Sequence, residues 1–186
     1  MAHSSDLFQS RRRSNSMALA AFQITKSERR KSELSTVREG SSPTTVFTIG
    51  YERRDGEELV GRLREYGIDV LVDVRERPFS RKPDFRRNAL EQRCAESGIE
   101  YQSWTRLGST ASQREIHASG DLSTFMSRFR TFAKRGRGDE LDALAELAKR
   151  STIALICYER AHAECHRCVV SELLADRLDA TIVAIE

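Results

Sequence analysis

Two hydrophobic patterns alternate along the chain after residue 45. Short and nearly continuous apolar runs, rich in β-branched residues, predict buried strands at residues 45–50, 68–75, 152–158 and 181–186, and "IEYQSW" at residues 99–104 predicts a further strand. Apolar residues spaced by three or four positions predict amphipathic helices at residues 55–66, 84–97, 122–134, 139–150 and 164–178. Residues 107–121 show neither period, so the sequence predicts a long loop there.

The order of these elements predicts an α/β fold. Strands that alternate with helices pair in parallel, because each right-handed crossover lays its helix over one face of the sheet. We therefore expect a Rossmann-like three-layer domain with about five mostly parallel strands, helices on both faces and the strand order 3-2-1-4-5. Open α/β sheets bind ligands beyond the carboxyl ends of the strands, where the strand order reverses. In the expected order this place lies between the first and fourth strands.

Composition separates the first 45 residues from the rest of the 186-residue chain. They contain 8 Lys+Arg and 4 Asp+Glu, a formal charge of +4, and the remainder carries −1, which gives the net +3 of the chain. The first 45 residues therefore hold the whole excess of positive charge and predict a disordered basic tail. Residues 46–186 suit a single domain. No segment of the sequence approaches the ~20 consecutive apolar residues of a membrane helix. We therefore expect a cytoplasmic protein with no membrane partner, whose four cysteines are thiols or ligands.

A dense polar motif follows the fourth predicted strand. The stretch "CYERAHAECHRC", residues 157–168, holds three cysteines, two histidines and two glutamates. Cys165 opens the next predicted helix, where the helix dipole and the neighbouring His166 and Arg167 favour a thiolate. We predict that Cys165 is an activated thiol, that Cys157 is its helper or redox partner, and that His166 takes part in catalysis. The alternative is that these cysteines are small core residues.

Two carboxylates end predicted strands. Asp73 follows the second strand and Glu159 the fourth, so both are candidates for acid–base chemistry. In the expected order the first strand separates them, which places their backbones about 9.6 Å apart, twice the strand spacing. Asp73 also has a second interpretation, which we favour: it orients Arg75 or Arg167, because a buried carboxylate usually needs a cationic partner.

The mouth of the predicted crevice is basic although the domain as a whole is nearly neutral. Arginine side chains and a helix N-terminus match phosphate oxygens, whereas surface ion pairs are the competing explanation. Tyr51 and Trp104 are candidates for stacking on a nucleobase, and either ring could instead belong to the core. The residues predicted to bind substrate or anion are Tyr51, Arg75, Arg77, Pro78, Ser80, Arg81, Lys82 and Arg167.

A metal site is the alternative use of the same motif. Cys157, His162, Cys165 and Cys168 supply enough ligands for tetrahedral zinc. Against this, Cys165 and Cys168 would lie within one helical turn, and no second knuckle follows. Apart from this zinc alternative, we predict no cofactor.

Several short motifs together resemble a known family. They are "TIGYE" at residues 48–52, "LVDVRERPFSRKPDF" at 71–85, "LG" at 107–108, "SGD" at 119–121 and "CYERAHAECHR" at 157–167. This set resembles domain-of-unknown-function family 488 from residue 46 to the end of the chain. The resemblance implies a compact α/β fold and no established reaction. Cys168 stands where the family has Ser, and Ser109-Thr110 where it has Asn-Pro.

Three hypotheses follow for function. The first is a small cytoplasmic enzyme that binds a phosphorylated, nucleotide-like or nucleic-acid substrate in the crevice and uses a cysteine or the two carboxylates. The second is a non-catalytic module that binds a nucleotide or nucleic acid. The third is a structural domain stabilised by zinc. The sequence leaves the substrate, the reaction and the oligomeric state open.

Overall fold

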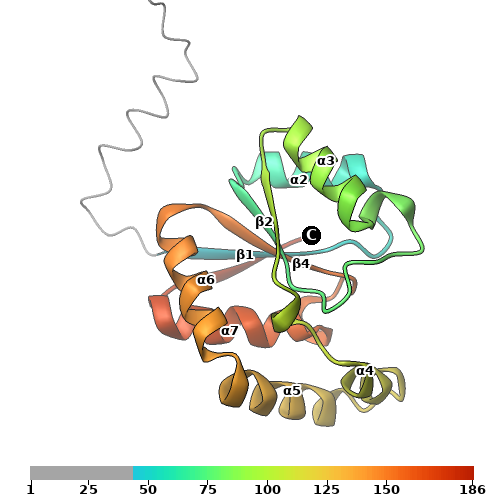
Figure 1. The fold of residues 1–186 in the computed structure, drawn as a ribbon, viewed down its shortest axis with the longest axis vertical. Helices are drawn as coiled ribbons and strands as arrows, with labels where there is room; N and C mark the ends of the chain where they lie inside the picture. Colours follow the sequence, from blue (N-terminus) through green and yellow to red (C-terminus); the bar gives the residue numbers. More distant parts are fainter. Residues whose placement is uncertain (1–43) are drawn as a thin grey trace, which may run out of the picture. The chain divides into compact units, whose positions relative to one another are not determined.

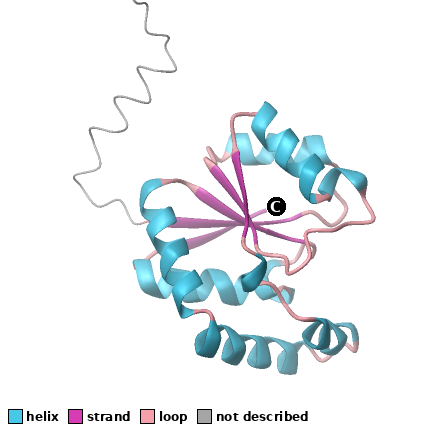
Figure 2. Ribbon diagram, viewed as in Figure 1, coloured by secondary structure: helices cyan, strands magenta, loops and turns pink. Residues whose placement is uncertain are grey.

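The computed structural model describes residues 44–186, which form one five-stranded sheet with helices on both faces (Figures 1 and 2). All strand pairs are parallel, as predicted. The expected basic tail lies outside the described residues except for Thr44 and Thr45, and Thr45 already belongs to the first strand. No helix within residues 44–186 is long and apolar enough to cross a membrane.

The five strands occur in the order β3-β2-β4-β1-β5. Their bounds are β1 (Thr45–Gly50), β2 (Val70–Asp73), β3 (Glu100–Ser103), β4 (Ile153–Cys157) and β5 (Thr181–Ile185). The predicted fold class is confirmed, but the predicted order 3-2-1-4-5 exchanges the first and fourth strands. Every residue of β4 is buried, whereas β3 and β5 contain exposed residues. The most apolar strand therefore occupies the centre and the more polar strands the edges.

Six helices lie within the described residues. They are α2 (Gly56–Glu65), α3 (Arg87–Glu96), α4 (Ala111–Ala118), α5 (Leu122–Gly136), α6 (Gly138–Arg150) and α7 (His166–Leu178). Apolar residues of α2 and α3 pack with one face of the sheet, and those of α5, α6 and α7 with the other. Figure 1 shows α2 and α3 on one side of the strands and α6 and α7 on the opposite side. The two apolar clusters account for the three-layer architecture.

One of the first two helices begins later than the sequence predicts. Asp55 caps α2 as expected, since its carboxylate accepts a hydrogen bond of 2.8 Å from the Glu58 amide. Asp84, where the sequence predicts the next helix to begin, instead accepts a hydrogen bond of 3.1 Å from the Gly56 amide at the N-terminus of α2. It belongs to the short 3-10 helix η1 (Pro83–Phe85), and α3 begins only at Arg87.

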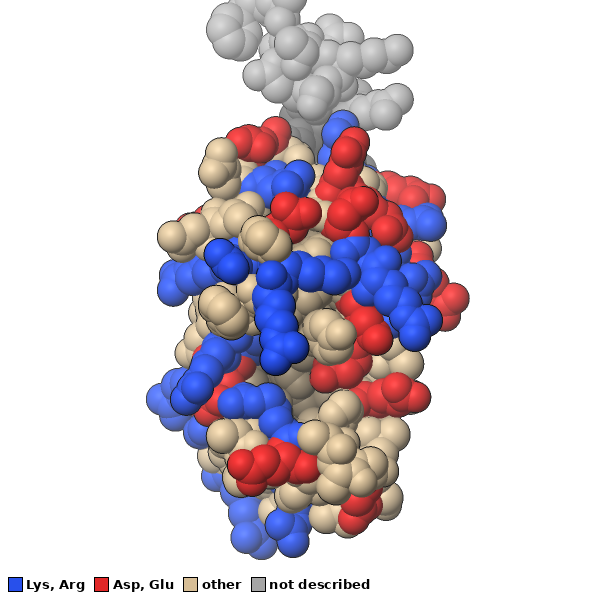
Figure 3. All heavy atoms as spheres, turned by 90° about the vertical axis from the view of Figure 1, so that its right-hand side faces the viewer, with Lys and Arg blue, Asp and Glu red and all other residues tan. Residues whose placement is uncertain are grey.

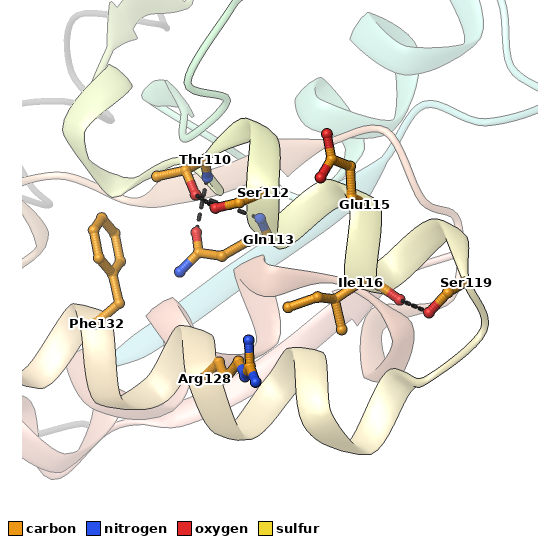
Figure 4. Close-up of a pocket in the computed structure, with 8 residues that line it drawn as sticks. All are labelled: Thr110, Ser112, Gln113, Glu115, Ile116, Ser119, Arg128 and Phe132. Carbon is orange, nitrogen blue, oxygen red and sulfur yellow. Dashed lines mark hydrogen bonds between the residues drawn. The ribbon is translucent and has the colours of Figure 1, made fainter.

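The segment predicted as a long loop, residues 107–121, contains α4. Thr110 and Gln113 form a capping box at its start, visible as dashed lines in Figure 4. This Thr-x-x-Gln signature is present in the sequence. The prediction missed the helix because eight residues are too few to display a clear hydrophobic period.

Candidate functional site

The carboxyl ends of three strands meet at one level of the sheet. Gly50 of β1 lies beside Cys157 of β4, and Asp73 of β2 lies beside Ile156 on the other side of β4. A cavity of about 840 Å³ opens there and is lined mainly by the segment after β2 and by the segment between β4 and α7. Figure 3 shows Lys and Arg side chains gathered around a hollow on one face of the domain. The cavity lies beyond the carboxyl ends of the strands, but its main walls follow β2 and β4, whereas the expected place was between the first and fourth strands.

Two glycines allow the loops around the cavity to approach the strands closely. A Cβ atom on Gly50 would lie 1.9 Å from the carbonyl oxygen of Glu159, and one on Gly108 would lie 1.9 Å from the amide nitrogen of Glu76. Both neighbours are backbone atoms that cannot move aside cheaply. Glycine is therefore required at both positions for the observed loop packing.

Four side chains from the β4–α7 segment converge on one point. The ligand atoms of Cys157, Glu159, Cys165 and His166 all lie within 4.8 Å of one another. The Cys157 thiol donates to the Glu159 carboxylate at 3.3 Å, and His166 Nδ1 lies 3.6 Å from the Cys157 sulfur and 3.7 Å from the Cys165 sulfur. We call these four residues the thiol cluster.

The imidazole of His166 has a fixed orientation. Its Nε2 lies 2.9 Å from the carbonyl oxygen of Val74, which can only accept, so Nε2 carries a proton and donates it. In the neutral ring Nδ1 then presents its lone pair to both sulfurs. The ring is only 4% exposed and packs edge-on against Phe129, with centroids 5.2 Å apart. His166 is thus held in the tautomer that accepts a proton from either thiol.

The two thiols of the cluster differ in acidity and position. Burial alone would raise the pKa of Cys165, but the Cys157 thiol and the charges of His166 and Arg167 lower it well below its ordinary value. Burial and the neighbouring Cys165 raise the pKa of Cys157. Of the two thiols, Cys165 is therefore the more acidic. Cys165 is fully buried, whereas Cys157 and His166 line the cavity, so the sulfur that faces a ligand is that of Cys157.

Burial and the neighbouring Cys165 raise the pKa of Glu159 from 4.5 to about 7. Because the folded protein favours the protonated carboxyl, this group contributes to the free energy of unfolding below pH 4.5. That contribution is lost as the pH rises through about 7. We expect Glu159→Gln, which mimics the protonated form, to leave stability unchanged at pH 4.5 and to raise it by about 2 kcal/mol at pH 8. Urea unfolding at both pH values measures this difference. Glu164→Gln, at an exposed position of the same segment, is the control, and an equal effect of Glu159→Gln at both pH values would contradict the prediction.

Asp73 and Arg75 form a buried ion pair beside the cluster. Two guanidinium nitrogens of Arg75 donate to the two carboxylate oxygens of Asp73, and Tyr101 donates its hydroxyl to the same carboxylate at 2.7 Å. The remaining nitrogen donates to the Tyr51 hydroxyl at 3.0 Å and to the Phe85 carbonyl at 2.9 Å. Asp73 thus orients Arg75, which is the interpretation we favoured, and the donors of Arg75 are engaged by protein groups. Because β2 and β4 are neighbours, the predicted separation of 9.6 Å between the Asp73 and Glu159 backbones does not apply.

Arg167 is likewise engaged inside the protein. Its guanidinium donates to the carbonyl oxygens of Glu159 and Arg160, and the side chain is almost completely buried. Its Nε has no hydrogen-bond partner among the described residues. Arg167 therefore fixes the turn that carries Glu159 and places a positive charge beside Cys165.

The remaining residues predicted to bind an anion lie in the segment after β2. Arg77 and Arg81 are exposed, line the cavity and have no side-chain partner within residues 44–186. Lys82 lines it as well, but its ammonium donates to the Arg54 carbonyl at 2.8 Å. Ser80 is buried and accepts from the Lys82 amide at 3.1 Å, and the Pro78 carbonyl accepts from the Arg87 amide. Only Arg77 and Arg81 of this set are therefore free cations within the described part of the chain.

The aromatic residues proposed for stacking are not available for it. Tyr51 is buried and stacks on Phe85, with centroids 4.3 Å apart, and Trp104 packs against the apolar core, with its indole donating to Gln102 at 2.9 Å. The rings exposed at the cavity are those of Phe79 and Tyr158. The sequence did not predict either residue, because a loop has no hydrophobic periodicity that would distinguish an exposed aromatic ring from a buried one.

The structure also changes the set of metal ligands. His162 lies 2.9 Å from the Thr48 hydroxyl through Nδ1, and the Cys168 thiol donates to Glu172 at 3.3 Å, so neither joins the thiol cluster. Glu159 and His166 lie in the cluster in place of His162 and Cys168. Two sulfurs, one imidazole nitrogen and one carboxylate make a donor set that zinc accepts, and a histidine whose other nitrogen donates to a carbonyl is common in such sites. The cluster could therefore hold a metal with little side-chain movement.

A second hollow lies between α4 and α5 and has a volume of about 610 Å³. Figure 4 shows its walls, which include Gln113 and Ile116 from α4 and Arg128 and Phe132 from α5. It contains neither a thiol nor a pair of carboxylates, so we assign it no chemistry.

Comparison with known proteins gives one match. No curated protein and no solved structure matches the chain. The profile of the family described as domain of unknown function DUF488 matches residues 55–174, which include β2, β4, the thiol cluster and the segment after β2. This range is well over half of the chain and confirms the resemblance drawn from the motifs, so the chain belongs to the DUF488 family.

Proposed function

We propose that this protein is an enzyme that binds a phosphorylated, nucleotide-like or nucleic-acid substrate in the 840 Å³ cavity and acts on it with the thiol cluster. The observation that carries the proposal is the meeting of two thiols, an oriented imidazole and a carboxyl with a pKa of about 7 at the wall of one basic cavity. Groups with shifted pKa values that share a cleft are characteristic of catalytic sites.

The cluster supports nucleophilic transfer or hydrolysis through Cys157. The Cys157 proton moves to the Cys165–His166 pair, and the freed sulfur electron pair forms a bond to the electrophilic atom of the substrate. The leaving group departs with the electrons of its broken bond and takes a proton from Glu159 or from the imidazolium of His166. Attack by water or another acceptor on the covalent intermediate then releases the thiol of Cys157. In this scheme Cys165 takes up the proton of Cys157 together with His166, and it does not contact the substrate.

The experiment that tests the proposal is alkylation of each cysteine by iodoacetamide between pH 5 and 10, followed by mass spectrometry. The pKa of Cys157 itself is raised, but its proton can pass to the more acidic Cys165, which leaves the single negative charge of the cluster on Cys157 for part of the time. We therefore expect alkylation of Cys157 to begin at a pH below the ordinary thiol pKa of ~8.5. Cys94 and Cys168 are internal controls, since burial raises their pKa to about 12 and about 11. Cys165→Ser removes the more acidic thiol that takes this proton, so the low-pH reaction of Cys157 should move to higher pH. Cys168→Ser should leave it unchanged.

Other outcomes favour the two rival functions. If Cys157 reacts only above pH 8.5, like an ordinary thiol, thiol catalysis is excluded and a non-catalytic binding module is the better explanation. If Cys157 and Cys165 become reactive only after a chelator is added, the cluster holds a metal and the zinc hypothesis replaces the thiol nucleophile.

A further inference from the structure

The mouth of the cavity exposes two aromatic rings. Three large hydrophobic side chains are exposed within residues 44–186, and two of them, Phe79 at 67% and Tyr158 at 47%, line this cavity. Exposed apolar rings that border a polar cavity are a frequent mark of a binding surface. The two rings come from the segments after β2 and after β4, so they belong to the two walls that also carry the basic residues and the thiol cluster.

Free positive charges flank one of these rings. Arg77 and Arg81 stand two residues before and two residues after Phe79, and both are exposed, line the cavity and lack a side-chain partner within the described residues. Arg86 adds a third charge, with its guanidinium 5.6 Å from the Phe79 ring. Glu76, an acidic residue of the same wall, offsets little of this charge, because it is paired with Arg114 at 2.8 Å.

The second ring rests on a rigid support. Tyr158 meets the Tyr51 ring edge-on, with centroids 5.4 Å apart. Tyr51 in turn stacks on Phe85, and its hydroxyl accepts a hydrogen bond from Arg75. Arg75 is fixed by its ion pair with Asp73. Because these side-chain contacts support the Tyr158 ring, it loses little conformational entropy when a flat ligand packs on it.

From these features we propose that the ligand of the cavity is a nucleoside phosphate, with its base packed against Phe79 and Tyr158 and its phosphate held by Arg77 and Arg81. Phosphate alone would explain the arginines but gives no reason for two exposed rings, whereas a nucleotide has both an anionic group and a π face. The cavity volume of 840 Å³ is within the range of about 300–1,000 Å³ typical of small-molecule sites. The nucleotide can be free or stand at an unpaired position of a strand. This inference rests on the proposed function in taking the cavity as the substrate site.

Calorimetric titration tests the inference with four probes: AMP, adenosine, ribose 5-phosphate and a single-stranded oligoadenylate of eight nucleotides. We expect AMP or the oligonucleotide to bind at least 10-fold more tightly than either adenosine or ribose 5-phosphate, because each of the latter lacks one of the two recognised groups. The preference between AMP and the oligonucleotide tells whether the natural ligand is free or part of a strand.

Matched variants assign the two groups of the ligand to the two sets of side chains. Phe79→Ala and Tyr158→Ala should each weaken binding of the tighter probe about 10-fold or more, and Arg77→Gln with Arg81→Gln should weaken it and remove the preference for AMP over adenosine. Tyr66→Ala is the control, since Tyr66 is exposed outside the cavity. Binding of ribose 5-phosphate as tight as that of AMP, unaffected affinity in both aromatic variants, or no binding of any base-containing probe would overturn the inference.

A further arm separates this inference from the proposed thiol chemistry. AMP at saturating concentration should slow alkylation of Cys157 and leave that of Cys168 unchanged, because only Cys157 lines the cavity. Titration of AMP into Cys157→Ala should still show binding. Retained nucleotide binding with an ordinary Cys157 thiol would refute thiol catalysis and leave the nucleotide site standing, whereas an activated Cys157 without nucleotide binding would refute only the nucleotide site.

Discussion

Replacement of Arg75 by methionine is expected to lower the free energy of unfolding by about 3–5 kcal/mol, the largest effect of any substitution considered for this domain. The reason is the charge that remains. Asp73 is completely buried, and its carboxylate would keep only the Tyr101 hydroxyl and the Arg75 amide as donors. The Tyr51 hydroxyl and the Phe85 carbonyl would also lose their partner. A buried charge without a counterion costs far more than an intact pair contributes.

Urea unfolding followed by circular dichroism measures this loss. Arg77→Met is the matched control, because Arg77 is exposed and unpaired within the described residues, and it should change stability by less than about 0.5 kcal/mol. The double variant Asp73→Asn with Arg75→Met removes both charges and should be more stable than Arg75→Met alone. A loss below about 1 kcal/mol for Arg75→Met would mean that the ion pair is not buried as described.

Replacement of Arg167 by methionine is expected to cost about 2–4 kcal/mol and to alter the thiol cluster as well. The carbonyl oxygens of Glu159 and Arg160 would lose the donors that hold their turn, and each buried acceptor left unpaired costs about 1–3 kcal/mol. The guanidinium also lowers the pKa of Cys165, so its removal should raise that pKa and move alkylation of the cluster to higher pH. Stability and chemistry should therefore change together.

Two further variants keep this prediction testable. Arg160→Met removes an exposed arginine from the same turn and should affect neither stability nor alkylation. Arg167→Lys keeps the positive charge but cannot donate to both carbonyl oxygens as the guanidinium does. This variant should therefore be less stable than the wild type, while its cysteines should still be alkylated at nearly the same low pH. If Arg167→Met unfolds like the wild type and its cysteines react at the same pH, Arg167 neither fixes the turn nor acts on Cys165.

Much of the architecture was predictable because its signals are local. Continuous apolar runs identified four of the five strands, "IEYQSW" predicted the remaining one, and the spacing of apolar residues identified every described helix except α4. Alternation of strands and helices implied a parallel sheet, and a parallel sheet collects the carboxyl ends of its strands at one edge. That rule alone brought Cys157 and Glu159 of the β4–α7 segment together with the residues that follow β2.

The strand order and the partners of the polar side chains were not predictable in the same way. Both 3-2-1-4-5 and the observed order satisfy right-handed crossovers, and the choice depends on which apolar faces pack together across the whole domain. Likewise, the motif offered His162 and Cys168 as readily as His166 and Glu159. Side-chain direction decided among them, since α7 turns Cys168 toward Glu172 and the loop turns His162 toward Thr48.

The sequence by itself determined the fold class, the family and the edge of the sheet where polar residues gather, because these depend on periodicity and on chain order. Only the tertiary structure decided that Cys165 is buried behind Cys157, that Arg75 and Arg167 serve the protein's own carboxylate and carbonyl groups, and that Phe79 and Tyr158 are exposed at the cavity. Burial and hydrogen-bond partners arise from contacts between segments distant in the chain, and no local pattern in a single sequence records them.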